Sequence, residues 1–275
     1  MEVQSIAEQL FFTTVKMELE TARGLVLGPG FFFDYKAGEK DYIFVVTNKH
    51  VITNASRGRF FFNVDDEGKP NLGEKFTATM DNFKEKWFTH PDPSVDVAVT
   101  PFAPIYNSVR EKRVLIFFRT INANLIPNNQ ALSELDTIEE IVFVGYPIGL
   151  SDSVNNTPIA RRGITATPIN IDYEGKKQFL IDASVFPGSS GSPVFIFNRG
   201  SYPEKKGGLV IGGRFLFIGL VAAVIYEEET GRIESLDTPY RGTPIVKIKQ
   251  MIDLGIVYKG VTVVETIEAF LASTT

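Results

Sequence analysis

The 275-residue sequence contains no cysteine and only two histidines. Without cysteine there is no disulfide, no thiolate nucleophile, no iron–sulfur cluster and no thiol-rich zinc site. Two histidines leave few ligands for any other metal. We therefore do not expect a metal site.

Long hydrophobic runs and a strong excess of one charge are also missing. The longest apolar run is Phe215–Tyr226, which is well short of the roughly 20 residues that cross a bilayer, so it predicts a buried strand. The first residues show no basic segment followed by an apolar core, which predicts an unprocessed, cytoplasmic protein with no membrane partner. A net charge of −5 does not favour phosphate backbones, so nucleic acid is not an expected partner.

The residues that are present describe a globular chain rich in phenylalanine, with 44% hydrophobic residues and 23 Phe. Its apolar segments are short, and many are rich in β-branched and aromatic residues, which favours strands. Gly, Pro, Asn and Asp separate them, as in turns. The pattern predicts an all-β protein with strands near Gly24–Phe33, Tyr42–Thr47, Arg59–Val64, Val95–Thr100, Ile141–Tyr146, Ile159–Thr167, Phe179–Ala183, Pro193–Phe197 and Phe215–Tyr226.

Helix is expected in only two places, in part of Ser5–Glu20 and over Pro244–Leu254, where isoleucines recur at near-helical spacing behind a proline. The stretch Phe102–Leu135 differs from its surroundings because it carries prolines and a basic cluster. This stretch is therefore predicted to connect two halves of the chain. We expect a first unit over residues 1–102, a linker over 103–135, and a second unit over 136–275 that ends with a C-terminal helix.

The sharpest local signal is the segment Phe186–Pro193, in which small residues surround Ser190. Small side chains let backbone N–H groups crowd around a reacting carbonyl oxygen, and glycine adopts the backbone angles that such a turn needs. A serine hydroxyl is a poor nucleophile until an imidazole takes its proton. Ser190 therefore needs a histidine and an orienting acid.

Two histidines and one aspartate are the candidates for these roles. His50 follows an apolar strand, where it would stand at the rim of a barrel. Asp96 interrupts an apolar segment, and burial of a carboxylate is costly without a partner. His90 lies in a proline-rich loop, and we interpret it as a packing or hydrogen-bonding residue.

The order His50, Asp96, Ser190 with these neighbours resembles the trypsin/chymotrypsin family of serine proteases, especially its bacterial Deg (high-temperature-requirement) branch. The positions are 46 and 94 residues apart (50 to 96, 96 to 190), close to the family's intervals. The matching segments are Gly28–Phe31, Thr47–Val51, Asp96–Ala98, Gly145–Leu150, Arg162–Ala166 and Ile181–Pro193.

The resemblance implies two six-stranded antiparallel β-barrels and a serine endopeptidase acting on protein or peptide substrates. It makes Ser190 the nucleophile, His50 the general base, and Asp96 the residue that fixes the tautomer of His50. The backbone N–H groups of Gly188 and Ser190 would form the oxyanion hole. No cofactor or metal is implied, and the sequence does not predict an oligomeric state.

Three departures from the family pattern stand out. Ser189 replaces the acid that pairs with a newly cut N-terminus, so activation by that ion pair is not expected. Ser192 replaces a family glycine directly after the nucleophile turn. No PDZ module follows, which predicts a stand-alone protease domain.

Substrate preference is predicted from the family's primary pocket. Ser184 stands at its base, where an acid would select Lys or Arg. Ala222, Ala223 and Val224 match the strand that pairs with substrate. We expect cleavage after small or medium uncharged residues, with the acidic run Glu227–Glu229 able to bring charge to the rim.

Some residues are interpreted as structural only, and a second function stays open. Asp182 is interpreted as structural, and Arg110–Arg113 as a solvated charge run. The chain is interpreted as an endopeptidase or, alternatively, as a latent or degenerate protease-fold binding module that needs a partner for activation. An esterase would use the same three residues.

Overall fold

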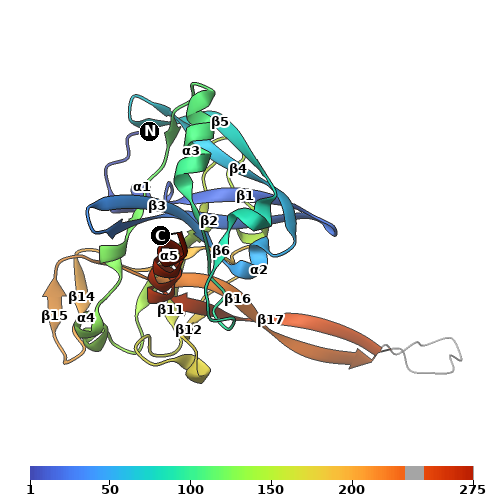
Figure 1. Ribbon diagram of the computed structural model, residues 1–275. Helices are drawn as coiled ribbons and strands as arrows, with labels where there is room; N and C mark the ends of the chain where they lie inside the picture. Colours follow the sequence, from blue (N-terminus) through green and yellow to red (C-terminus); the bar gives the residue numbers. More distant parts are fainter. Residues whose placement is uncertain (233–244, 275) are drawn as a thin grey trace, which may run out of the picture.

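The computed structural model describes residues 1–232 and 245–274 (Figure 1). Strands dominate both halves, as the short apolar segments predict. The first half contains α1 (Ile6–Leu10), β1 (Thr14–Thr21), β2 (Gly24–Ala37), β3 (Lys40–Thr47), α2 (Lys49–Ile52), β4 (Ala55–Asp66), β5 (Lys69–Asp81), the 3₁₀ helix η1 (Phe83–Lys86), β6 (Phe88–Thr89) and β7 (Ala98–Pro101). The crossing contains α3 (Phe102–Glu111), β8 (Ile116–Phe117), β9 (Ile121–Asn122), η2 (Ala123–Leu125) and α4 (Asn129–Glu134).

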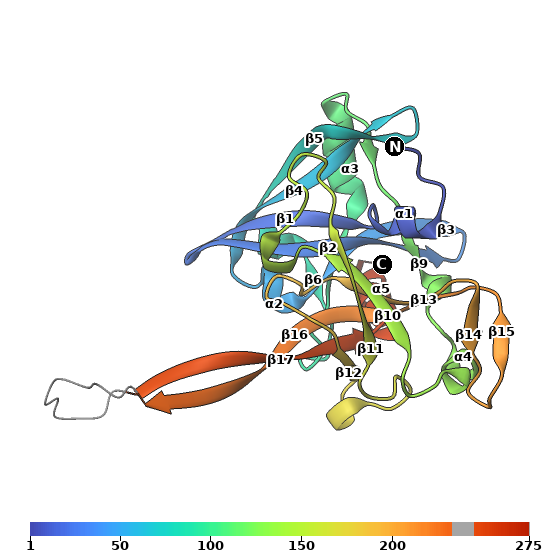
Figure 2. The same ribbon diagram turned by 180° about the vertical axis from the view of Figure 1, so that it is seen from behind.

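The second half begins at β10 and ends in a helix. Its elements are β10 (Glu140–Gly145), η3 (Pro147–Gly149), β11 (Ile159–Thr165), η4 (Tyr173–Gly175), β12 (Gln178–Asp182), β13 (Pro193–Asn198), β14 (Ser201–Pro203), β15 (Leu209–Ile211), β16 (Arg214–Arg232), β17 (Ile245–Lys259) and α5 (Val261–Thr274). The strands β14 and β15 form a separate two-stranded sheet near α4 (Figure 2).

The all-β class and the barrel of the second half are confirmed. Six strands close in the order β10-β11-β12-β17-β16-β13. β16 and β17 run on beyond the barrel as a long antiparallel hairpin, which projects from the body of the molecule (Figure 1).

The first half is a nine-stranded sheet with the path β5-β4-β1-β2-β3-β7-β6, and β8 and β9 pair with β4 and β2. Among the described residues its hydrogen bonds do not form the closed ring of six strands that the resemblance implies. β6 is only two residues long and pairs with β7 alone, so the path of paired strands ends there. The first strands of the expected linker thus belong to this sheet, and the division at residues 102 and 135 stays a prediction.

Alternation along β2 explains how the two halves share a core. Phe32 faces the interior of the first half, whereas Phe31 and Phe33 face a second cluster that includes Phe217 of β16 and Val263 of α5. Successive side chains of a strand point to opposite faces. Three consecutive phenylalanines are therefore fully buried because both faces of β2 are covered.

The C-terminal helix exists, but its expected position was wrong. Residues 245–254 lie in β17 instead, while Pro244 lies outside the described residues. The isoleucine spacing favours a helix, but pairing with β16 makes this segment a strand. Two bulges in β16 shift the register of the pairing. The helix is α5, which buries Val263 and Ile267 against the core shared by both halves.

Candidate active site

His50 and Asp96 meet at the edge of the first half. β3 ends at Thr47, and His50 lies in the single turn of α2 that follows; Asp96 lies just before β7 and not within a strand as expected. Asp96 Oδ2 is 2.5 Å from His50 Nδ1, and Asp96 Oδ1 accepts the backbone N–H of His50 at 2.9 Å. Both carboxylate oxygens are thus committed to His50.

This arrangement determines which ring nitrogen of His50 carries the hydrogen. An ionised carboxylate only accepts hydrogen bonds, so Nδ1 must be the donor and Nε2 keeps its lone pair. The His50 side chain is 50% exposed, whereas that of Asp96 is 21% exposed. In the neutral ring, Nε2 is therefore the basic nitrogen of a half-exposed side chain, and the acid behind Nδ1 is more sheltered.

Two residues beside His50, not singled out from the sequence, hold the Asp96 segment in place. Asn48 Nδ2 donates to the carbonyl oxygen of Asp96 at 2.7 Å. Lys49 Nζ donates to the carbonyl oxygen of Pro93 at 2.8 Å. The Thr47–Val51 motif thus supplies supports for the acid as well as the histidine, a role that local pattern does not reveal because the partners lie over 40 residues away.

The turn that carries Ser190 packs directly against the first half. Gly191 has φ +93°, and a Cβ there would lie 2.5 Å from Thr47 Oγ1 and overlap the carbonyl of Pro29. A Cβ on Gly28 would lie 3.1 Å from Val51 and 3.8 Å from the carbonyl oxygen of Ser190. Glycine at position 191 is therefore required for the close approach that brings Ser190 beside α2.

The Ser190 hydroxyl donates to the carbonyl oxygen of Ala222 on β16 at 2.9 Å. The structure thus joins His50 to Asp96 by hydrogen bonds and joins Ser190 to Ala222.

The backbone around Gly188 leaves two N–H groups available. The carbonyl oxygen of Pro187 accepts the N–H of Ile148 at 2.7 Å, and Gly188 has φ +84°. In a trans peptide the carbonyl and the following N–H point in opposite directions, so the N–H of Gly188 points away from that bond. Within the described part of the chain neither this N–H nor that of Ser190 donates to a protein acceptor. Two such donors can stabilise a developing oxyanion.

The two serines that depart from the family pattern, Ser189 and Ser192, are both buried. Ser189 is 1% exposed and Ser192 is fully buried, and neither hydroxyl has a partner among the described residues. A Cβ on Gly145 would overlap Ser192 Oγ. The extra hydroxyl at position 192 is accommodated because residue 145 has no side chain.

The residues expected to line a primary pocket lie near the turn. Ser184 is half-buried in the segment after β12, Ala222 is buried, and Ala223 and Val224 are half-buried on β16. Val185, beside Ser184, packs within the second barrel, where a Cβ on Gly255 would lie 2.8 Å from it. The side chains of Glu227–Glu229 lie outside the described residues.

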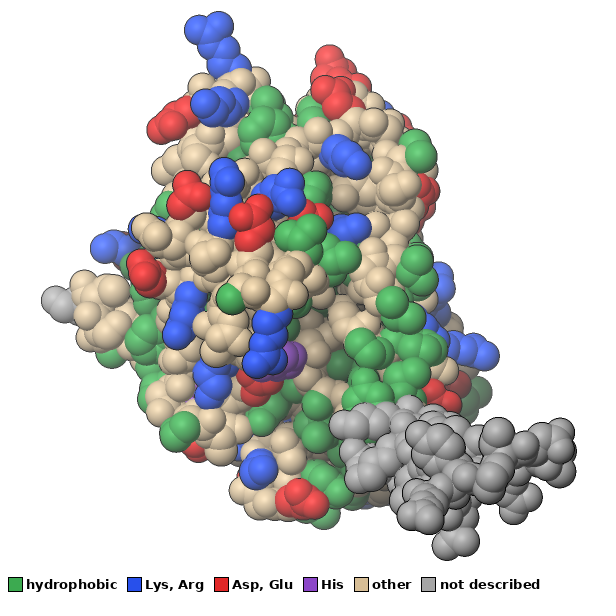
Figure 3. Space-filling view, turned by 90° about the vertical axis from the view of Figure 1, so that its right-hand side faces the viewer, with side chains coloured by type: hydrophobic (Ala, Val, Ile, Leu, Met, Phe, Trp, Pro, Cys, Tyr) green, Lys and Arg blue, Asp and Glu red, His purple; other side chains and the backbone are tan. Residues whose placement is uncertain are grey.

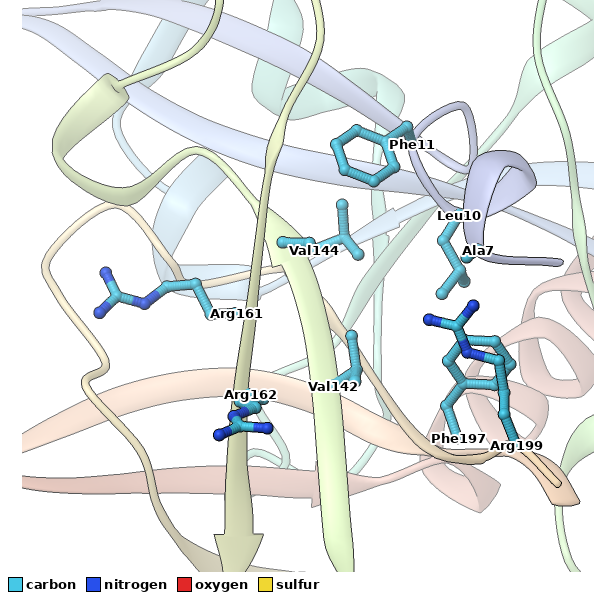
Figure 4. Close-up of a pocket in the computed structure, with 10 residues that line it drawn as sticks. Ala7, Leu10, Phe11, Val142, Val144, Arg161, Arg162, Phe197 and Arg199 are labelled. Atoms are coloured by element: carbon cyan, nitrogen blue, oxygen red, sulfur yellow. The ribbon is translucent and has the colours of Figure 1, made fainter. Parts of the chain in front are cut away.

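Four surface cavities of about 310 to 520 Å³ lie elsewhere, and none of them is lined by His50, Asp96 or Ser190. Figure 4 shows one of about 310 Å³, between α1 and the outer face of β10 and β11, with Arg161 pointing away from it. The candidate site is thus defined by its hydrogen bonds. No group of three or more His, Asp or Glu residues suited to a metal occurs in the described ranges.

Comparison with known families shows which family the chain belongs to. The model of the trypsin-like peptidase domain matches residues 28–201, more than half of the chain and a range that holds all three candidate residues. The chain belongs to the trypsin-like peptidase family. Membership supports a serine protease function. No curated protein matches the sequence.

Several solved protease structures are similar to this chain at low identity. They include the HtrA-type protease AlgW with a tripeptide, with a TM-score of 0.50, 14% identity, and coverage of 98% of this chain and 63% of that one. The Rv3671c protease from M. tuberculosis in its active form has a TM-score of 0.48 and 17% identity, covering 95% of this chain and 82% of that one. The serine endoprotease from Yersinia pestis has a TM-score of 0.47 and 16% identity, and the match covers 98% of this chain and 67% of that one.

This trypsin-like peptidase chain spans 61% to 63% of the length of two AlgW structures. Among the described residues, no helix has the length and apolar character needed to cross a membrane.

Proposed function

We propose that this chain is a serine endopeptidase in which Ser190 is the nucleophile, His50 the general base and Asp96 its orienting acid. The observation that carries the proposal is the double hydrogen bond from His50 to Asp96, which leaves Nε2 of His50 as a base at the surface. The Ser190 turn, packed against Thr47 and Pro29, brings a hydroxyl to the same edge.

In the proposed reaction the Ser190 hydroxyl leaves the Ala222 carbonyl and turns toward His50. His50 Nε2 takes its proton while Oγ attacks the peptide carbonyl carbon, and the oxyanion is held by the N–H groups of Gly188 and Ser190. The protonated His50 then gives its proton to the leaving amine, which frees the first product. Water, activated by His50, releases the acyl group from Ser190.

Substrate preference follows from Ser184 and the strand residues Ala222 to Val224. An uncharged pocket base and small apolar walls favour a small or medium uncharged residue before the cut. Exposed apolar side chains lie in the segment bonded to the turn, since Ile148 and Leu150 are each more than 60% exposed. Figure 3 shows hydrophobic side chains gathered on the face that carries the hairpin. We therefore also expect extended substrates with apolar residues near the cut.

A latent module is the second candidate, and one observation favours it. The Ser190 hydroxyl is bonded to Ala222 and not to His50. If a partner must shift β16 before this bond breaks, the isolated chain would fold but not react. An esterase would use the same groups on acyl esters.

Labelling with a fluorophosphonate, read by intact mass, tests the proposal. We expect one adduct on the unaltered chain and none on Ser190→Ala, whose turnover should fall by about six orders of magnitude, as in serine proteases of other folds. Ser201→Ala, an exposed serine on β14, is the matched control and should label normally.

A peptide-library digest and a parallel ester assay then define the substrate. Dominant cleavage after Lys or Arg would refute the proposed pocket. A folded chain that takes no adduct would refute the endopeptidase and support the latent module.

A further inference from the structure

His90 lies outside the candidate triad, but its contacts form a specific pattern. It begins the loop that ends at Asp96, and its backbone N–H donates to the carbonyl oxygen of Val97 at 3.0 Å, which closes the base of that loop. Its side chain is only 9% exposed. The loop between these two points carries the acid of the proposed site.

The ring nitrogens of His90 have two different partners. Nδ1 accepts the backbone N–H of Asp92 at 3.0 Å. An N–H can only donate, so Nδ1 of His90 must be without hydrogen. Nε2, 3.3 Å from Glu265 Oε2 on α5, is then the donor to that carboxylate. His90 is thus held as the neutral Nε2–H tautomer, the opposite of the tautomer derived for His50.

The loop has further ties to both halves of the molecule. Tyr258 of β17 donates its hydroxyl hydrogen to the carbonyl oxygen of Ser94 at 2.7 Å, and Lys49 holds Pro93 from the other side. The charged groups around His90 are Glu265, Asp92, and Lys177, which pairs with Glu265 at 2.5 Å. Hydrogen bonds from Ser94 to Asp92 lower the pKa of the Asp92 carboxyl, so the loop contains a charged, bonded turn.

We infer that His90 is a positioning residue for Asp96: it bridges the Asp92 backbone and Glu265 of the C-terminal helix, and so fixes where the loop presents its carboxylate to His50. The inference rests on the proposed function, because it concerns the acid of that site. His90 does not touch substrate. Through His90, the position of α5 on the first half affects the geometry of the His50–Asp96 pair.

The two-histidine composition makes the test direct. Nitrogen-15 histidine labelling of the full chain gives two imidazole spectra, and we expect one Nδ1–H ring (His50) and one Nε2–H ring (His90). The variants His90→Asn and Glu265→Ala remove the bridge. Asn keeps an acceptor for the Asp92 N–H but cannot reach Glu265. Glu265→Gln keeps an acceptor oxygen and should rescue.

We expect His90→Asn and Glu265→Ala to shift and broaden the Nδ1–H resonance of His50 and to lower kcat about 10- to 100-fold with little change in KM, since small displacements of catalytic groups have effects of this size. Glu265→Gln should retain the unaltered His50 resonance and the unaltered kcat. Glu268→Gln, on the same helix but bonded to Tyr35, is the matched control and should change neither.

The spectra separate this inference from the proposed function, because they are recorded equally well on Ser190→Ala. If the His50 resonance shifts as expected but the unaltered chain shows no peptidase activity, the positioning role is supported and the endopeptidase is refuted. An unshifted His50 resonance in folded His90→Asn, or an Nδ1–H tautomer at His90, overturns the inference.

Discussion

Single residues of the candidate site are constrained by which atoms can donate and which can accept. Asp96 accepts from His50 twice, so its role depends on having two acceptor oxygens at fixed positions. Ser192 shows the opposite case, since its hydroxyl is buried with no partner in the described part of the chain. We expect the first residue to contribute to reactivity and the second to lower stability.

Asp96→Asn should lower kcat by about four orders of magnitude while the chain stays folded. An amide in this place presents an N–H to His50 and favours the tautomer with hydrogen on Nε2, which then cannot accept the Ser190 proton. Stopped assays at neutral pH and the His50 nitrogen-15 spectrum measure both effects. Normal turnover with an Nδ1–H ring would contradict the assignment.

Ser192→Ala should raise the free energy of unfolding by about 1 kcal/mol, because it removes a hydroxyl that gives up its hydrogen bonds to water on folding and gains no partner among the described residues. Gly145→Ala should destabilise the chain, because its Cβ overlaps Ser192 Oγ. Urea unfolding of both variants and of the Gly145→Ala/Ser192→Gly pair measures this. Equal effects of Gly145→Ala with and without Ser192 would contradict the contact.

Among elements, α5 connects the second barrel to the first half. It packs Val263 and Ile267 into the cluster shared with β2 and β3, and its Phe270 ring lies 5.6 Å from that of Phe44. A helix with so many β-branched residues has weak intrinsic propensity. Its stability therefore depends on this packing.

Ile267→Ala should lower the free energy of unfolding by about 2 to 5 kcal/mol, the usual cost of a core cavity of this size. Val261→Ala, an exposed truncation in the same helix, is the control and should change it little. Urea unfolding gives the free energies, and hydrogen exchange shows whether α5 opens first. A small effect at Ile267 would mean that α5 does not need this contact.

At the scale of the whole molecule, three tyrosines join the two halves, and two of them, Tyr146 and Tyr258, are buried. Burial raises the pKa of Tyr146, which is 1% exposed. Burial and the bond to Glu268 raise the pKa of Tyr35 to about 12. Burial and the nearby charge of Asp96 raise the pKa of Tyr258. All three phenols are held in the protonated form when the chain is folded.

Stability should therefore be constant up to about pH 10, where an unfolded tyrosine begins to ionise, and fall as pH rises further toward the folded pKa values. A folded state that holds its proton more tightly loses about 1.4 kcal/mol per pH unit for each such buried group. Urea unfolding between pH 8 and pH 11 measures the slope, and Tyr146→Phe should reduce it. A flat profile to pH 11 would contradict the buried phenols.

Local patterns predicted many of the strands, but not β5, β17 or β1, which lies largely within the segment Ser5–Glu20 expected to be partly helical. The roles of the three candidate residues stay predictions. Short β-branched runs specify strands through their own periodicity, and a motif such as Thr47–Val51 or Phe186–Pro193 is contiguous, so both are visible without a partner. Phe31–Phe33 could be placed in a buried strand for the same reason. The turn around Ser190 could be predicted from its glycines and serines alone, whereas the oxyanion-hole role of Gly188 and Ser190 stays a prediction.

Tertiary structure decided the rest, because each remaining feature depends on residues far apart in the chain. Residues 245–254 form a strand and not a helix because β16 pairs with them. The first half does not form a closed ring because the short β6 pairs only with β7. The Ser190 hydroxyl bonds to Ala222, and His90 to Glu265 across 175 positions, because the fold places these acceptors there. A sequence alone specifies which groups can bond, whereas only the packed chain determines which of them meet.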